Sequence, residues 1–90
     1  MDILVKYVKD KKTKKSRGVL VAIDYNRVGM SLCNPIDKWN ANEGRILAAG
    51  RAALGISFDR AFPEHGSKSH LRKEYDSFCD QAKEHFLGKL

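Results

Sequence analysis

The sequence has few of the features by which membrane and secreted proteins are recognised. No apolar run approaches the roughly 18–20 residues that span a bilayer, and the 90 residues include only two cysteines and two prolines. The opening Met1-Asp2-Ile3-Leu4 lacks the basic-then-apolar order of a secretory signal. We therefore expect a cytoplasmic protein with reduced thiols and no membrane partner.

The sequence also has little that points to catalysis. Its histidines and cysteines follow no known metal-ligand spacing, and no Cys–His pair is suggested locally: His65, His70, His85, Cys33 and Cys79. General acid–base chemistry usually needs a second group beside the first, and none is evident. These absences predict no metal, no cofactor and no enzymatic activity.

What is present begins with three strand patterns. In "DILVKYVK", Ile3, Val5 and Tyr7 alternate with Leu4, Lys6 and Val8. The run "GVLVAIDY" is almost continuously apolar, which is typical of a strand covered on both faces. A third segment, "VGMSLC", alternates again. We therefore predict a three-stranded antiparallel β-meander over about residues 2–33.

Two helices are predicted after the strands, at about 41–54 and 67–87, which gives an α+β fold in a single domain, 1–90. Pro35 ends the third strand because proline cannot donate to a sheet. Asn40, with Glu43 three residues later, has the form of a capping box. Gly55 is a natural residue to follow the end of the first helix.

The faces of the helices can also be predicted. On the first helix, an apolar stripe is expected to pack on the sheet, with Leu47 beside it: Ile46, Gly50, Ala53 and Leu54. Ala48 and Ala52 lie opposite, and glycine inside the helix, at Gly44 and Gly50, suggests close approach at those points.

The second helix has a stripe typical of a core or a subunit interface: Leu71, Tyr75, Phe78, Ala82 and Phe86. The connection between the helices is expected to bury Phe58 and Phe62. Because 90 residues bury only a modest core, a homo-oligomer is expected.

Positive charge is concentrated near the N-terminus. The first 18 residues hold seven Lys and Arg against two Asp, whereas the other 72 hold ten against nine acidic residues. The segment "KDKKTKKSR" fits two interpretations. Clustered lysines are typical of a nucleic-acid binder, and they also keep an exposed hairpin soluble. The segment has no aromatic residue and a single Arg, which favours the second interpretation.

The start of the first helix contains a candidate binding site. Arg45 lies in the first turn, where its charge opposes the helix dipole unless an anion is bound. Asn40 can donate to and accept from a ligand, and Arg51 flanks the same helix. Trp39 offers a plane for stacking a base, although it could equally anchor the turn in the core. Together these residues suit a nucleotide or phosphate ester.

The segments "VGMSLCNP", "DKWN" and "GRILAAGRAALG" resemble small phage-encoded proteins, and more narrowly the Thoeris anti-defence sponges. Members of that family bind cyclic ADP-ribose isomers made by bacterial TIR proteins, and some also hold cyclic oligonucleotides. They have an N-terminal antiparallel sheet, two C-terminal helices and a pocket between subunits. The resemblance implies ligand contacts at Met30 and Asn40, with Arg51 and Arg60 as candidates for later Arg contacts. Met30 departs from the aromatic residue expected there.

The resemblance implies a non-enzymatic protein that sequesters a cyclic nucleotide-derived immune signal in the host cytoplasm and so blocks anti-phage defence. It would act as a homo-oligomer, a dimer or larger. A different class stays open, in which a small basic phage protein takes over a host function by binding nucleic acid or an acidic host protein through the Lys-rich hairpin. An enzyme that cleaves a cyclic nucleotide is disfavoured because no catalytic pair is evident.

Overall fold

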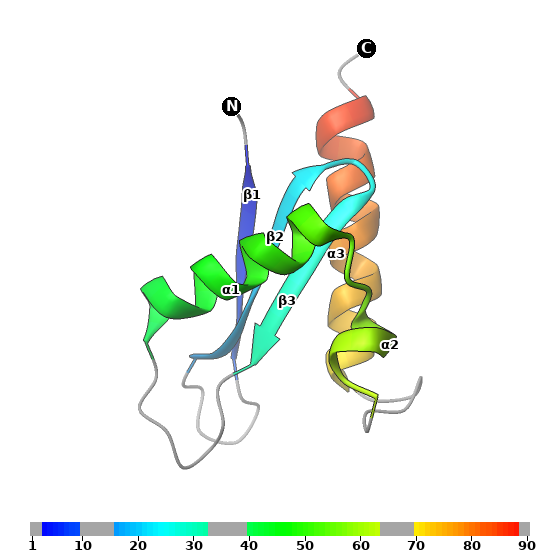
Figure 1. Cartoon of the computed structure of the whole chain (residues 1–90). Coiled ribbons are helices and arrows are strands. Elements are labelled where there is room, and N and C mark those ends of the chain that lie inside the picture. The colour runs from blue at the N-terminus through cyan, green and yellow to red at the C-terminus, as the bar shows by residue number, and fades with distance from the viewer. Residues whose placement is uncertain (1–2, 10–15, 33–39, 64–69, 89–90) are drawn as a thin grey trace.

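A computed structural model describes residues 3–9, 16–32, 40–63 and 70–88. It contains a three-stranded antiparallel sheet followed by helices, and the predicted α+β class is confirmed (Figure 1). The elements are β1 (Leu4–Lys9), β2 (Ser16–Asp24), β3 (Arg27–Leu32), α1 (Ala41–Leu54), α2 (Phe58–Ala61) and α3 (His70–Leu87). The short helix α2 lies where the sequence predicted only a connection.

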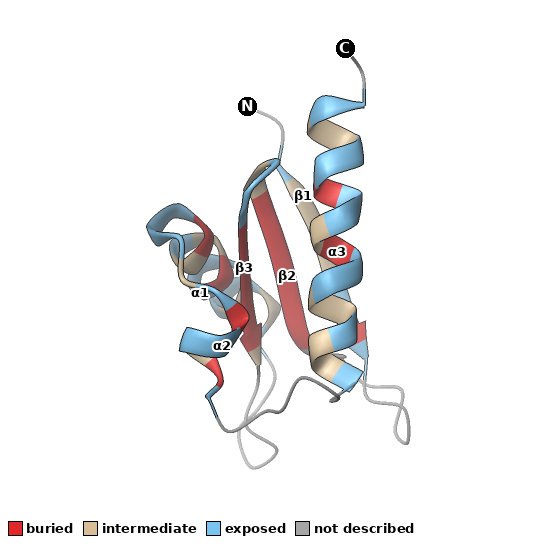
Figure 2. Ribbon diagram, turned by 90° about the vertical axis from the view of Figure 1, so that its right-hand side faces the viewer, coloured by how far each residue is buried: buried red, intermediate tan, exposed pale blue. Residues whose placement is uncertain are grey.

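The sheet is the predicted meander, with strand order β1-β2-β3. Val21 of β2 pairs with Val5 of β1 and with Gly29 of β3, which fixes the register across the sheet. Four consecutive residues of β2 are at most 1% exposed: Val19, Leu20, Val21 and Ala22. The central strand is therefore covered on both faces, because α1 lies on one side of the sheet and α3 on the other (Figure 2).

Large side chains fill the face of the sheet that α3 covers. Phe78 and Ala82 of α3 are fully buried there together with Leu20 and Met30. The helix α2 lies beside β3, and its Phe58 joins this core with the ring of Phe62 at 5.3 Å between centroids and that of Tyr75 at 5.6 Å. The predicted stripe of α3 and the burial of Phe58 and Phe62 are both confirmed.

The other face of the sheet contradicts the predicted orientation of α1. Ala48 and Ala52 are fully buried against the sheet, whereas Ile46 is 66% and Leu54 75% exposed. The reason lies in Gly29 on β3, where an added Cβ would overlap the backbone of Ala48 and Ala52. Backbones so close together leave room only for the smallest side chains, so the alanine face packs inward and the larger apolar stripe faces outward.

The ends of α1 are as predicted, but the close approach predicted at Gly50 is not found among the described residues. The Asn40 side chain accepts a hydrogen bond from the backbone N–H of Glu43 at 3.1 Å, as an N-cap does. Gly55 has φ 69°, the left-handed conformation of a C-terminal glycine. At Gly50, however, a Cβ would meet nothing within 4 Å, so no close approach among the described residues requires this glycine.

Candidate functional site

A hydrogen bond attaches the N-terminal half of α1 to the sheet. Ser31 on β3 is 2% exposed, and its hydroxyl donates to the carbonyl oxygen of Gly44 at 2.7 Å. Together with the Asn40 cap, this bond fixes the start of the helix over β2 and β3. The same face of β1 is left partly uncovered, with Ile3 54% and Tyr7 39% exposed.

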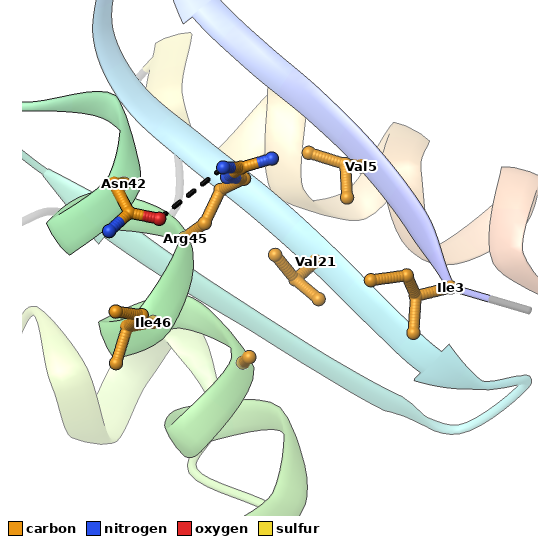
Figure 3. Close-up of a pocket in the computed structure, with 7 residues that line it drawn as sticks. Ile3, Val5, Val21, Asn42, Arg45 and Ile46 are labelled. Atoms are coloured by element: carbon orange, nitrogen blue, oxygen red, sulfur yellow. Dashed lines mark hydrogen bonds between the residues drawn. The ribbon is translucent and has the colours of Figure 1, made fainter. Parts of the chain in front are cut away.

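Between α1 and this uncovered part of β1 lies a pocket of about 230 Å³, which we call the α1–β1 groove (Figure 3). It is lined by Ile3, Val5, Val21, Asn42, Arg45, Ile46 and Ala49. Five of these residues are apolar, and the two polar ones both come from the start of α1. The groove therefore combines an apolar floor with a cation and an amide, the pattern of a small-molecule site.

Arg45 is the group of this groove that is available to a ligand. Its guanidinium extends from α1 over the sheet beside Asn42 (Figure 3). It donates to the Asn42 side-chain oxygen at a long 3.4 Å, and it forms no ion pair with any residue that the structure describes. An exposed Arg at a helix N-terminus without a carboxylate partner can accept an anion.

Arg51 has a different role from Arg45. Its guanidinium donates to the backbone oxygen of Met30 on β3 at 2.7 Å and lies over the Phe62 ring at 5.1 Å from the centroid. Burial lowers the pKa of this guanidinium. Arg51 thus ties α1 to β3 and to Phe62, and the structure does not place it in the α1–β1 groove with Arg45.

The other predicted site residues are also separated. Met30, expected as an apolar wall for a ligand, is 2% exposed in the core under α3, because its register position on β3 points it away from α1. Asn40 uses its side-chain oxygen as the helix cap. Arg60 is exposed on α2, outside the groove. Trp39 and the Lys-rich segment 10–15 lie outside the described residues.

Sequence reasoning missed the apolar floor of the groove. The alternation in β1 places Ile3 and Val5 on one face, and this signal was visible. That the buried Val21 of β2 forms part of the lining beside them depends on where α1 crosses the sheet, which the sequence did not reveal. On sequence grounds Asn42 can cap the helix or bind a base or ribose, and only the folded chain places it beside Arg45 in the groove.

Outside the groove, the described residues offer little reactive chemistry. No group of three His, Cys, Asp or Glu side chains among them is arranged to hold a metal ion. Cys79 on α3 is half-buried, and burial raises the pKa of its thiol, which makes it a poor nucleophile. None of the described helices is long and apolar enough to cross a membrane.

Comparisons of this chain with protein-family models, with curated proteins and with solved structures each find no match.

Proposed function

We propose that the protein binds and sequesters a compact nucleotide-derived signal, a cyclic ADP-ribose isomer or a cyclic oligonucleotide, without changing it chemically, and that it does so as a homo-oligomer. The observation that carries the proposal is the guanidinium of Arg45, which has no ion-pair partner among the described residues and lies beside Asn42 at the rim of an apolar groove. The identity of the signal is taken from the resemblance to the anti-defence sponges. Sequestering that signal would block anti-phage defence.

The chemistry of the groove matches the parts of such a ligand. A base or sugar ring can pack on the apolar floor made by Val5, Val21 and Ala49. A phosphate beside it can accept charge-assisted hydrogen bonds from Arg45. The phosphate would also offset the unfavourable position of a cation in the first turn of α1.

The size of the groove limits how much of the ligand it holds. At about 230 Å³ it lies below the roughly 300–1,000 Å³ of typical small-molecule sites. One ring with its phosphate fits there, and the rest of a cyclic dinucleotide or of cyclic ADP-ribose would extend beyond the rim.

Calorimetric titration with cyclic ADP-ribose isomers and cyclic oligonucleotides tests the proposal. The complex is then heated, and the released ligand is identified by chromatography. We expect saturable binding and recovery of the intact ligand. Recovery of a cleaved ligand would make the protein an enzyme. No binding to any of these ligands, with tight and salt-sensitive binding to nucleic acid instead, would favour the Lys-rich hairpin as the functional element.

Two Arg variants locate the site. Arg45→Gln should weaken binding by about ten-fold or more, since losing one charge-assisted hydrogen bond removes about 1.5–3 kcal/mol. Arg60→Gln, also at an exposed Arg, is the matched control and should bind normally. Thermal melts of both variants should match the wild type. Equal affinity of Arg45→Gln and the wild type would exclude the groove.

A further inference from the structure

The solvent-facing side of α1 carries an apolar surface that the described part of the chain leaves exposed. We call it the outer face of α1, and it consists of Ile46, Leu47, Gly50, Ala53 and Leu54. Its three large side chains are 66%, 48% and 75% exposed in that order. Single exposed apolar residues are ordinary, but a contiguous group of them on one helix marks an interaction surface.

Gly50 at the centre of this face is unexplained by the fold of a single chain. Glycine inside a helix is less favourable than alanine, and a Cβ here would meet nothing within 4 Å. Ile46, Gly50 and Leu54 follow one another at intervals of four residues and so form one ridge of the helix. Gly50 makes a notch in this ridge between two large side chains, where another helix can approach closely.

The spacing of the outer face is symmetric about that notch. Ile46 and Leu54 lie four residues to either side of Gly50, and Leu47 and Ala53 lie three residues to either side. An antiparallel copy of the same helix would therefore place Ile46 against the partner's Leu54, and Leu47 against the partner's Ala53. We infer that α1 pairs with α1 of a second copy of this chain, about a two-fold axis that passes beside Gly50.

The helix dipoles favour a second copy as the occupant. The net charge of +6 opposes self-association, but the five residues of the outer face carry no charge, so pairing brings no like charges together within that face. Antiparallel pairing sets the positive N-terminal end of each helix beside the negative C-terminal end of the other. A face without charged residues would give an acidic partner protein no cation to recognise.

The pairing is expected to be reversible. A helix of 14 residues is about 21 Å long, and one crossing of two such helices buries less than the roughly 1,000 Å² typical of a stable interface. We therefore expect monomer and dimer to exchange at micromolar concentration. Ile46 belongs both to the outer face and to the lining of the α1–β1 groove, whereas the polar groups of the groove, Asn42 and Arg45, are not part of the outer face. The observations behind the pairing do not include the proposed ligand.

Sedimentation velocity over a concentration series tests the pairing. The wild type should pass from monomer to dimer as concentration rises. Gly50→Leu enlarges the apolar surface but fills the notch, so it should weaken the dimer at least ten-fold. Leu54→Gln should weaken it by a similar factor. Leu87→Gln, at a 42% exposed leucine on α3, is the matched control and should dimerise as the wild type does.

Each alternative outcome overturns the inference. A wild type that stays monomeric up to millimolar concentration has no such interface. A Gly50→Leu variant that dimerises as tightly as the wild type would show non-specific association of apolar surfaces in place of helix pairing at the notch. An equal effect of Leu87→Gln would move the contact to α3. Circular dichroism melts confirm that each variant is folded, and ligand titration of Gly50→Leu reports separately on the groove.

Discussion

The two faces of the sheet are held by different means. On the side of α3, fully buried large side chains such as Phe58, Phe78 and Leu20 fill the space between helix and strands. On the side of α1, the fully buried residues of the helix are Ala48 and Ala52, and the backbones lie nearly in contact. One layer is stabilised mainly by apolar area, and the other mainly by a close fit with a few hydrogen bonds.

This difference predicts which kind of substitution destabilises each face most. Apolar burial scales with the area removed from water, so the α3 face should respond most to the loss of large side chains. The α1 face has little side-chain area to lose, and it should respond most to added volume or to the loss of a polar tie. The α1 face also carries the groove and the outer face of α1, because a helix that packs through alanines leaves its larger residues free.

The largest loss of stability is expected from a substitution on the α3 face. Phe78→Ala should lower the free energy of unfolding by about 3–5 kcal/mol, since the ring is fully buried in the core. Urea denaturation followed by circular dichroism measures the loss. Lys83→Ala, exposed on the same helix, is the control and should change stability by less than about 0.5 kcal/mol. A loss below about 1 kcal/mol at Phe78 would mean that α3 is not packed as described.

The next largest effect is on the α1 face and comes from adding one methyl group. Gly29→Ala should lower the free energy of unfolding by about 3 kcal/mol, because the new Cβ would overlap the helix backbone at Ala48 and Ala52. The matched control is Gly50→Ala, measured at low protein concentration. There the Cβ meets open space, and the change should stabilise the monomer by about 0.5–1 kcal/mol. A Gly29→Ala variant as stable as the wild type, or more stable, would refute the close fit at Gly29.

A smaller effect is expected from the polar tie at the start of α1. Ser31→Ala removes the hydrogen bond to the Gly44 carbonyl and should cost about 1 kcal/mol of stability. Ser77→Ala, at an exposed serine on α3, serves as the control and should be neutral or slightly stabilising. Equal unfolding curves for Ser31→Ala and the wild type would show that the start of α1 is held by other contacts.

The smallest effect at neutral pH is expected for Tyr75→Phe on the α3 face. The Tyr75 hydroxyl donates to the Val28 carbonyl at 3.4 Å, a long bond whose loss should cost less than about 1 kcal/mol. The variant becomes informative at alkaline pH, because burial raises the pKa of Tyr75 from 10.0 to about 12.

The sign of this pH dependence follows from the raised pKa. The folded state holds the Tyr75 proton more tightly than the unfolded state does, so this contribution to stability is complete below pH 10 and is lost as the pH rises toward about 12. Wild type and Tyr75→Phe should therefore differ by a constant amount below pH 10, and the variant should gain on the wild type above it. Denaturation at a series of pH values measures both curves. Parallel curves throughout would show that the hydroxyl is solvated in the folded protein.

Much of the local structure was predictable because its causes lie within a few residues. The cap at Asn40, the stop at Gly55 and the stripe around Phe78 depend on neighbours in sequence, and each is found where it was predicted. The candidate site was predicted less well. The first turn of α1 does line a pocket through Arg45, but Arg51 and Met30 take part in packing on other surfaces.

The sequence by itself determined the order of the elements, the antiparallel sheet and the two covered faces of β2, since period and capping express local sterics and burial. Only the tertiary structure decided which side of α1 faces the sheet. Hydrophobicity favoured the stripe that contains Ile46 and Leu54. The missing side chain at Gly29, however, allows the backbones of β3 and α1 to meet. Side chains larger than alanine are excluded from that contact. The rotation of α1 about its own axis also separates Arg45 from Arg51, because the position of each guanidinium depends on how the whole helix is turned against the sheet.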